Sequence, residues 1–180
     1  MKISYLYLLA FLIILNGCVT TGKSPSKEVA VKHTGSGTLV IKQIGFSQES
    51  NVREAVRNEC NLDGKLAGFI EKNAATQYSQ ILTKANSTTP GSQVLTIEIE
   101  QVQGGAGGAW SGGKMVLING KLTQNGKELG NFKGKRFSGG GVFAGYKGTC
   151  SILGRCVKTL GKDVAQWLAQ PTPNARLGDL

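Results

Sequence analysis

The sequence is poor in the residues from which most active sites and metal sites are built. It contains one histidine, His33, and four cysteines among 180 residues. His33 falls in a stretch rich in Ser, Thr, Gly and Lys, which is typical of a linker. Catalysis by a nucleophile and a base, or a His/Cys metal cluster, needs groups that a folded scaffold holds in place. The sequence therefore predicts no catalytic residues, no metal and no cofactor.

A complete phosphate-binding loop is also lacking. Gly108 is followed, after four residues, by Gly113 and Lys114, but Met115 stands where such a loop needs Ser or Thr. The segment "MVLINGKLT" is β-branched and alternating, so it predicts a strand and not the helix that a phosphate site requires. We therefore do not expect a nucleotide-binding protein.

No apolar run reaches the roughly 20 residues of a membrane span. A thirteen-residue apolar stretch from Ile3 to Leu15 ends in small residues, which is typical of a cleaved secretory signal. The letters "LNGC" at its end resemble the lipobox of bacterial lipoproteins. By that resemblance residues 1–17 are a signal peptide and Cys18 carries the lipid, and Val19, which is not aspartate, favours the outer membrane. The alternative is an ordinary secretory signal with a chance cysteine.

Basic residues outnumber acidic ones but form no run of five. The chain has 21 Lys and Arg against 11 Asp and Glu, and loss of the signal removes only Lys2, which leaves a net charge of +9. Such a balance favours anionic lipid or a cell-wall polymer such as peptidoglycan as a partner, or simply keeps the protein soluble. Nucleic acid is not expected because the periplasm lacks it.

One folded domain is expected between two loose ends. Residues 18–37 mix Ser, Thr, Gly, Pro and Lys and form the lipidated tether. Residues 38–170 are long enough to bury an ordinary core. Residues 171–180 begin with "PTP", which ends the preceding helix and predicts a flexible tail.

The apolar pattern of the domain predicts a strand, a helix, three strands and a helix. Residues 38–46 are β-branched, residues 61–84 repeat apolar positions at helical spacing, and residues 94–102 alternate. Two further strands are joined across "NG" at 125–126, a strong hairpin signal. The last helix carries an apolar stripe of Leu153, Cys156, Val157, Leu160, Val164, Trp167 and Leu168. We predict an α+β two-layer sandwich in the order β-α-β-β-β-α, with two helices on one face of a four-stranded sheet.

The chain resembles uncharacterised bacterial envelope lipoproteins. The features that carry this resemblance are the order of elements, the lipobox, "GGAWSG" ahead of a hairpin and "GTCSILGRC" at the start of a helix. Their domain is similar to the α/β fold of the amino-terminal part of TolB and of CsgG-type and penicillin-binding-protein-activator lipoproteins. The resemblance covers residues 38–170. It implies a role in assembly and protein contacts in the envelope, and it transfers no catalytic residue.

Glycine is concentrated in two segments that flank the predicted hairpin. Fifteen of the 26 glycines fall between positions 104 and 148. Because strands two and four of the predicted sheet run the same way, both segments leave the same end of it. We expect Trp110, Phe143 and Tyr146 to form an aromatic rim there that binds a partner. The alternative is that the two segments are merely flexible connections.

The exposed face of the sheet is expected to be charged. Five charged residues, at alternate positions along the predicted strands, are expected to point to it: Glu98, Glu100, Lys121, Lys133 and Lys135. Opposite charges on neighbouring strands stabilise a sheet by roughly 0.2–1 kcal/mol per pair. We favour such pairing over a ligand site on this face.

Three thiols remain after lipidation, so one is left unpaired. A parallel crossover from the first strand to the second places the starts of both helices at one end of the sheet. Cys60 and Cys150 precede the two helices, whereas Cys156 lies on the buried stripe and behaves as a small apolar residue. We predict a Cys60–Cys150 disulfide with Cys156 free. The alternatives are a local Cys150–Cys156 bridge and three reduced thiols.

Two classes of function remain. The first is a non-catalytic interaction or assembly module, anchored by lipid to the periplasmic face of the outer membrane, with an envelope protein as its expected partner. The second is an enzyme or enzyme subunit that acts on envelope polymer through carboxylates such as Glu98, Glu100 or Asp163. A carrier of lipid or of a small ligand is a further alternative.

Overall fold

The computed structural model describes residues 32–85, 89–104, 113–139 and 148–180. These residues form seven strands and three helices, in the order β1 (Thr38–Ile41), β2 (Gly45–Phe46), α1 (Glu54–Cys60), α2 (Leu62–Ala74), β3 (Gln80–Thr83), β4 (Gln93–Gln103), β5 (Lys114–Gln124), β6 (Lys127–Ser138), α3 (Thr149–Ala169) and β7 (Ala175–Gly178). The predicted mixture of strands and helices is confirmed. The predicted numbers, four strands and two helices, are wrong for the described residues.

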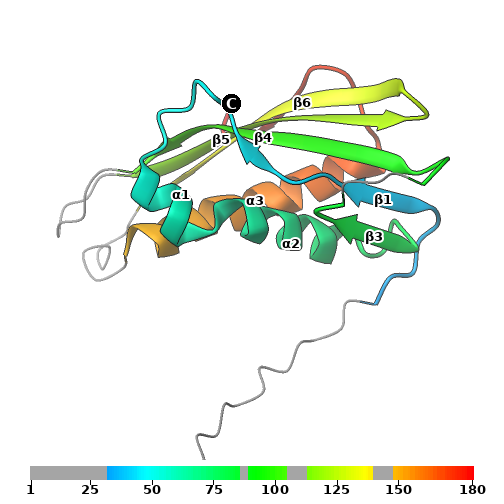
Figure 1. The fold of residues 1–180 in the computed structure, drawn as a ribbon, viewed down its shortest axis with the longest axis horizontal. Helices are drawn as coiled ribbons and strands as arrows, with labels where there is room; N and C mark the ends of the chain where they lie inside the picture. Colours follow the sequence, from blue (N-terminus) through cyan, green and yellow to red (C-terminus); the bar gives the residue numbers. More distant parts are fainter. Residues whose placement is uncertain (1–31, 86–88, 105–112, 140–147) are drawn as a thin grey trace, which may run out of the picture. The chain divides into compact units, whose positions relative to one another are not determined.

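All seven strands belong to one sheet, in the order β3-β1-β4-β5-β6-β7, with β2 also paired to β4. β1 runs parallel to β3 and β4, β5 is antiparallel to both β4 and β6, and β7 is parallel to β6. Figure 1 shows the three helices together on one face of this sheet. The two-layer arrangement is thus the one that the sequence predicts, with more elements in each layer.

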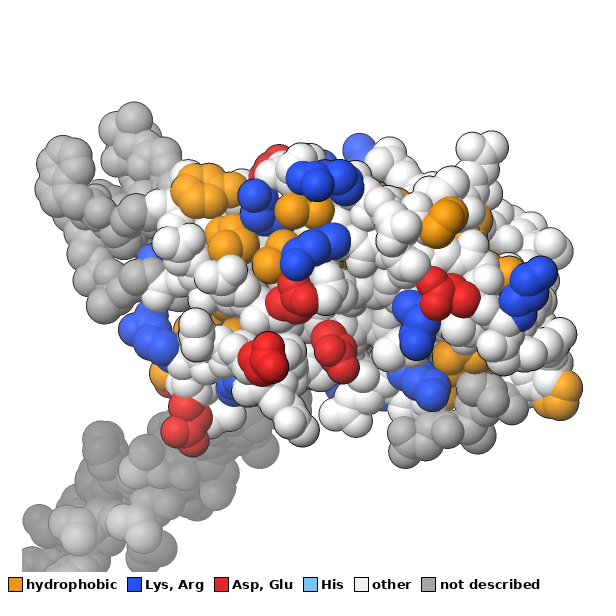
Figure 2. All heavy atoms as spheres, turned by 90° about the horizontal axis from the view of Figure 1, so that it is seen from above, with side chains coloured by type: hydrophobic (Ala, Val, Ile, Leu, Met, Phe, Trp, Pro, Cys, Tyr) orange, Lys and Arg blue, Asp and Glu red, His pale blue; other side chains and the backbone are white. Residues whose placement is uncertain are grey.

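The other face of the sheet has no helix over it (Figure 1). Figure 2 looks onto this open face, where acidic and basic side chains are mixed over the strands. The alternation of β4 explains it: Leu95, Ile97 and Ile99 are fully buried under the helices, whereas Glu98 is exposed on the opposite side. A strand with one buried face has this period of two.

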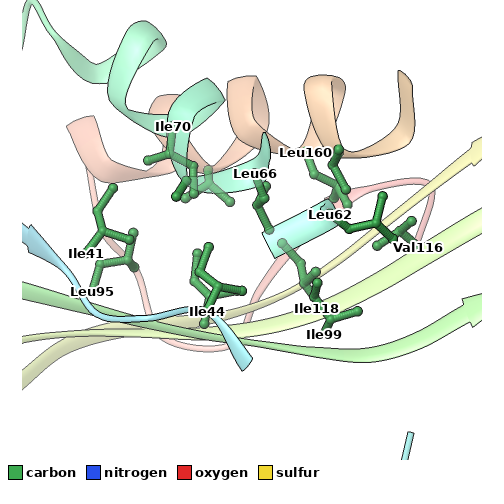
Figure 3. Close-up of a cluster of buried hydrophobic side chains, with 14 of the residues drawn as sticks. Ile41, Ile44, Leu62, Leu66, Ile70, Leu95, Ile99, Val116, Ile118 and Leu160 are labelled. Carbon is green, nitrogen blue, oxygen red and sulfur yellow. The ribbon is translucent and has the colours of Figure 1, made fainter. Parts of the chain in front are cut away.

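The core fills the space between the sheet and the helices. Leu62, Leu66 and Ile70 project from α2 at helical spacing and are fully buried against the strands (Figure 3). The predicted stripe of α3 is also buried at all seven positions. One glycine sets the distance between the two helices: a Cβ at Gly161 of α3 would lie 2.5 Å from the Cβ of Phe69 in α2.

The first predicted strand, residues 38–46, is interrupted. β1 and β2 both pair with β4, through Ile41 beside Leu95 and Phe46 beside Ile99. Between them the amide of Lys42 still donates to the carbonyl of Leu95, at 3.0 Å. The segment therefore follows β4 throughout, and only its regular pairing is broken.

The helix predicted over residues 61–84 ends ten residues early. α2 stops at Ala74, and β3 follows as an edge strand whose Ile81 lies beside Leu39 of β1. Ile81 fits the helical spacing by coincidence and is buried in the sheet instead. Backbone pairing with β1 outweighs the helical pattern here, because β-branched residues such as Ile81 and Thr83 fit a strand better.

The sequence did not predict α1, a short helix just before α2. Its residues Val56 and Cys60 are buried, and Asn61 separates the two helices in the left-handed region, at φ 46°. Asparagine adopts this conformation more readily than most residues. Arg57 fixes the preceding loop, because its guanidinium donates to the carbonyl of Val52 at 3.1 Å and to the hydroxyl of Ser50 at 2.6 Å.

The hairpin between β5 and β6 is confirmed. Asn125 and Gly126 both have positive φ, 49° and 79°, and Gln124 pairs directly with Lys127. A two-residue turn with positive φ at both central positions matches the twist of the strands that it joins. Met115 and Phe137 lie beside each other near the other end of this long pair.

Both ends that the sequence assigned to loose segments contribute to the fold. At the carboxyl end, β7 lies in residues 171–180, where a flexible tail was predicted, and pairs with β6. At the amino end, the amide of Thr34 donates to the carbonyl of Ala75, at 3.0 Å, and that of Ser36 to Gln77, at 3.2 Å. The tether assigned to residues 18–37 is therefore shorter than predicted at its carboxyl end.

Candidate functional site

The residues of the predicted aromatic rim, Trp110, Phe143 and Tyr146, lie outside the described residues, as does Cys18. The residues that flank the two glycine segments are described, and they converge. Gln103 pairs with Met115, Lys114 pairs with Ser138, and a Cβ at Gly104 would lie 3.3 Å from the Thr149 methyl group. We call this region, defined by Gly104, Gly113, Ser138 and Thr149, the loop end of the sheet. Both segments start and finish there.

One exposed aromatic side chain stands at the loop end. Phe137 is 56% exposed, more than any other large apolar residue in the part of the chain that the structure describes. Its ring lies against Gly113, where an added Cβ would overlap it, and its amide donates to the Asp179 carboxylate at 2.8 Å. The ring is thus presented to solvent from a strand whose backbone is fixed. Aromatic side chains in such positions are typical anchors at protein interfaces.

Sequence reasoning did not select Phe137, although the signal was available. Phe132 on the same strand is buried, and its ring meets that of Trp167 edge to face at a centroid distance of 4.8 Å. Positions 132 and 137 differ by an odd number, so their side chains leave opposite faces of a regular strand. The alternation of β6 therefore predicts an exposed aromatic ring once Phe132 is assigned to the core.

Behind Phe137, an arginine joins three elements. Arg136 donates from Nε and Nη2 to the two carboxylate oxygens of Asp163 in α3, at 2.7 and 2.8 Å, and from Nη1 to Asp179 after β7, at 2.9 Å. The hydrogen bonds that Arg136 donates to Asp163 are the main reason that the pKa of the guanidinium is raised above its already high value. The last strand is thus fixed to both layers of the domain next to the exposed ring.

On the open face, the predicted charge pairing is present for Glu100. This residue sits at a β-bulge of β4, between Ile99 and Gln101, and its carboxylate contacts the Lys133 ammonium at 3.0 Å. It also accepts a hydrogen bond from the Asn119 side chain. Glu98, Lys121 and Lys135 have no ion pair among the residues described. The face thus carries a fixed Glu100–Lys133 pair among exposed charges.

Two shallow hollows meet on the same face at Asn119 and Gly120. One, of about 340 Å³, is lined also by Thr96, Glu98 and Lys121. The other, of about 400 Å³, is lined also by Asn131, Phe132, Lys133, Asn174, Ala175 and Arg176. They are open to solvent, so they do not enclose a ligand as small-molecule sites usually do.

The carboxylates that a hydrolytic enzyme would need are mostly engaged. Glu100 is paired with Lys133, and Asp163 is paired with Arg136 and is largely buried. His33 is half-buried at the start of the described chain, far in sequence from these acids. Over residues 32–85, 89–104, 113–139 and 148–180, no group of His, Cys, Asp or Glu is arranged to hold a metal ion.

A disulfide joins the helix layer near the loop end. Cys60 at the end of α1 is bonded to Cys150 in the first turn of α3, with 4.9 Å between their Cα atoms. This is the pairing that the sequence favoured over Cys150–Cys156. Cys156 is free and buried, and its thiol lies 3.6 Å from the carbonyl oxygen of Lys114. Burial raises the pKa of the Cys156 thiol to about 11, with a smaller contribution from the Asp179 charge.

The helices in the described ranges are all too short or too polar to cross a membrane.

The sequence matches no protein-family model and no curated protein. Among solved structures, an uncharacterised protein matches 75% of this chain and 94% of its own, with 8% identity and a TM-score of 0.51. A Xanthomonas campestris protein of the family model DUF330 matches 77% and 87% of the two chains, with 10% identity and a TM-score of 0.49. A minor lipoprotein from Acinetobacter baumannii matches 79% and 98%, with 10% identity and a TM-score of 0.41. The chain therefore shares its fold with the first of these proteins, and the resemblance to TolB and CsgG-type domains stays a prediction.

Proposed function

We propose that this chain is a non-catalytic lipoprotein of the outer membrane, anchored through Cys18, that binds an envelope protein through the loop end of its sheet. The anchor rests on "LNGC" behind the apolar stretch of residues 3–15, which resembles a lipobox. Each buried CH₂ of an acyl chain contributes roughly 0.8 kcal/mol, so two or more chains on one cysteine hold a protein durably on a membrane. Val19 after the cysteine supports the outer membrane.

The exposed ring of Phe137 is the observation that carries the binding proposal. It lies where both glycine-rich segments leave the sheet, and these segments contain Trp110, Phe143 and Tyr146. Aromatic residues are enriched at protein interfaces, because a large rigid ring buries much apolar surface at little entropic cost. The backbone of Phe137 is fixed by Asp179, so little order has to be gained when a partner binds.

A photo-crosslinking amino acid in place of Phe137 tests this proposal in intact cells. Glu128 is the matched control position, because it is exposed on the same strand near the hairpin, at the opposite end from the loop end. We expect a discrete protein adduct from position 137 and none from position 128. Equal adducts from both positions, or none from 137 together with turnover of wall polymer by the purified protein, would contradict the interaction module and favour the enzyme.

The anchor is tested separately by Cys18→Ser. We expect the variant to lose incorporation of labelled fatty acid and to leave the outer-membrane fraction. Continued labelling, or a wild-type chain that fractionates as a soluble protein, would contradict the anchor and leave the interaction surface to be judged by crosslinking alone.

A further inference from the structure

A groove of about 540 Å³ runs between α2 and α3 on the outer side of the helix layer, away from the sheet. Four cations line it: Lys72 from α2, and Arg155, Lys158 and Lys162 from α3. Phe69, Asn73 and Thr159 complete the lining, and no acidic residue of the described ranges contributes to it. All four cations are exposed, and within the described part of the chain none of them forms an ion pair.

The arrangement of the cations is unfavourable for the isolated domain. Arg155 and Lys158 are three residues apart and Lys158 and Lys162 four residues apart on one helix, so their side chains are neighbours of like charge. The acidic residue of α3, Asp163, is turned toward Arg136 on the sheet side and does not compensate them. A helix face that concentrates one sign of charge around a groove is suited to an anionic partner.

The place where the tether joins the domain indicates which anion this is. The backbone amide of Thr34 donates a hydrogen bond to the carbonyl of Ala75, about one helical turn beyond Lys72 and Asn73 of the groove. Thirteen residues, 19–31, separate Cys18 from the described chain, and at about 3.5 Å each they reach no further than about 45 Å. A chain anchored at Cys18 therefore keeps this end of the helix layer within reach of phospholipid head groups.

We propose that the groove between α2 and α3 binds the phosphate groups of anionic phospholipids, so that the helix layer of the anchored domain lies on the membrane. Lys72, Lys158 and Lys162 contact phosphate oxygens, Arg155 donates two hydrogen bonds to one phosphate, and Phe69 packs against the glycerol carbons. The open face then points away from the membrane, and the loop end, which includes the start of α3, lies at the side of the docked domain, where a periplasmic partner can reach it. The membrane contact rests on the proposed lipid anchor, whereas the phosphate chemistry of the groove does not.

The orientation of the anchored domain on vesicles tests the proposal. The mature lipidated chain, with Cys156→Ala, carries a fluorophore on Gln166→Cys, on the helix face, or on Gln101→Cys, on the open face. Vesicles contain a quencher on the lipid head group and either phosphatidylglycerol or only phosphatidylcholine. We expect strong quenching at position 166 with phosphatidylglycerol, weak quenching with phosphatidylcholine, and weak quenching at position 101 with both.

Matched pairs of substitutions separate the groove from net charge. Lys158→Gln with Lys162→Gln should lower the ratio of docked to undocked domain by roughly tenfold or more, because each lysine at an anionic membrane contributes substantially to binding. Lys121→Gln with Lys127→Gln removes the same charge from exposed positions outside the groove and should leave the ratio unchanged. Added salt should weaken docking by screening. Equal losses from both pairs, or equal quenching on both kinds of vesicle, would overturn the groove.

Two further experiments distinguish lipid phosphate from free phosphate, and distinguish a failure of the groove from a failure of the anchor at Cys18. Inorganic phosphate that displaces the helix face from phosphatidylglycerol much better than sulfate does at equal ionic strength would overturn the lipid assignment and favour free phosphate. A chain that fails to float with phosphatidylcholine vesicles would contradict the anchor alone. In that case, flotation with phosphatidylglycerol vesicles is compared for the wild-type chain and for the variant Lys158→Gln with Lys162→Gln. A weaker flotation of the variant supports the groove, and equal flotation contradicts it.

Discussion

Arg136 of β6 and Asp163 of α3 form a two-point ion pair, with Nε–Oδ2 at 2.7 Å and Nη2–Oδ1 at 2.8 Å, which ties the sheet to the helix layer. The Asp163 side chain is 12% exposed and that of Arg136 is 28% exposed. Pairs of this kind are weakly stabilising overall, but removal of one partner leaves the other charge poorly solvated. Removal of one partner should therefore lower the free energy of unfolding by more than the intact pair itself contributes to it.

We predict that Asp163→Asn lowers the free energy of unfolding by about 1–3 kcal/mol, because the partly buried Arg136 loses its main partner. Asp179→Asn is the control: Asp179 is more exposed, and we expect a loss below about 1 kcal/mol. Urea denaturation of both variants and of the double variant measures the coupling. Equal losses for the two substitutions would contradict this ranking.

The disulfide should contribute much of the stability of the domain. Cys60 and Cys150 are 90 residues apart, and a loop of this length corresponds to about 4–5 kcal/mol in the chain-entropy model. Reduction, or the paired change Cys60→Ala with Cys150→Ala, should therefore lower the denaturation midpoint strongly, whereas Cys156→Ala should have a small effect. Peptide mapping without reduction gives an independent check. A peptide that joins Cys150 to Cys156 would contradict the pairing.

Two helical glycines should respond in opposite ways to the same substitution. Gly68 in α2 has open space where a Cβ would be added, so Gly68→Ala should stabilise the protein by up to about 1 kcal/mol through helix propensity. At Gly161 in α3 a Cβ would lie 2.5 Å from Phe69, so Gly161→Ala should destabilise by about 1–3 kcal/mol. Thermal denaturation of both variants measures the contrast. A stabilising Gly161→Ala would show that α2 and α3 are packed less closely.

Local signals predicted elements correctly, and contacts between distant segments account for the failures. Asn125 and Gly126 specify a hairpin by themselves, and the stripe of α3 has one period over its whole length. β3 and β7 have four residues each and exist through pairing with β1 and β6. For β7, the prolines before it predicted a loose tail, but the bonds of Asp179 to Arg136 and Phe137 hold its end in place.

The candidate site was predictable in part for the same reason. That both glycine segments leave one end of the sheet follows from the strand directions, which the hairpin and the parallel crossover set. The groove between α2 and α3 was not predicted, because it depends on which turns of two helices face each other. Lys72 and Lys158 come from different helices, and their approach follows from the close packing at Gly161.

Stability should fall at alkaline pH. Burial raises the pKa of Cys156 from 9.0 to about 11 and that of Tyr78 from 10.0 to about 12. Below pH 9 both groups keep their protons in the folded and the unfolded chain. Between about pH 9 and 11 the unfolded chain loses the Cys156 proton while the folded chain keeps it, so rising pH favours unfolding, by about 2 kcal/mol over this range.

Cys156→Ala should therefore flatten the pH dependence between about pH 9 and 11. Tyr78→Phe should act about one pH unit higher, and it also removes the hydrogen bond from the Tyr78 hydroxyl to Gln93, at 2.7 Å. Urea denaturation from neutral pH upward measures both effects. If the free energy of unfolding falls with pH equally steeply in the wild type and in Cys156→Ala, the loss of stability does not come from the Cys156 thiol.

The last prediction contrasts two aromatic residues of one strand. Phe137 is 56% exposed, so Phe137→Ala should change the free energy of unfolding by less than about 1 kcal/mol while it weakens binding of the protein captured by crosslinking. Phe132 is 3% exposed and packs on Trp167, so Phe132→Ala should cost about 3–5 kcal/mol. Trp110→Ala should behave like Phe137→Ala if the rim binds the partner. Denaturation and a binding titration with the captured protein are measured on each variant. A large loss of stability from Phe137→Ala, or unchanged affinity for the partner in both Phe137→Ala and Trp110→Ala, would show that the loop end is not the binding surface.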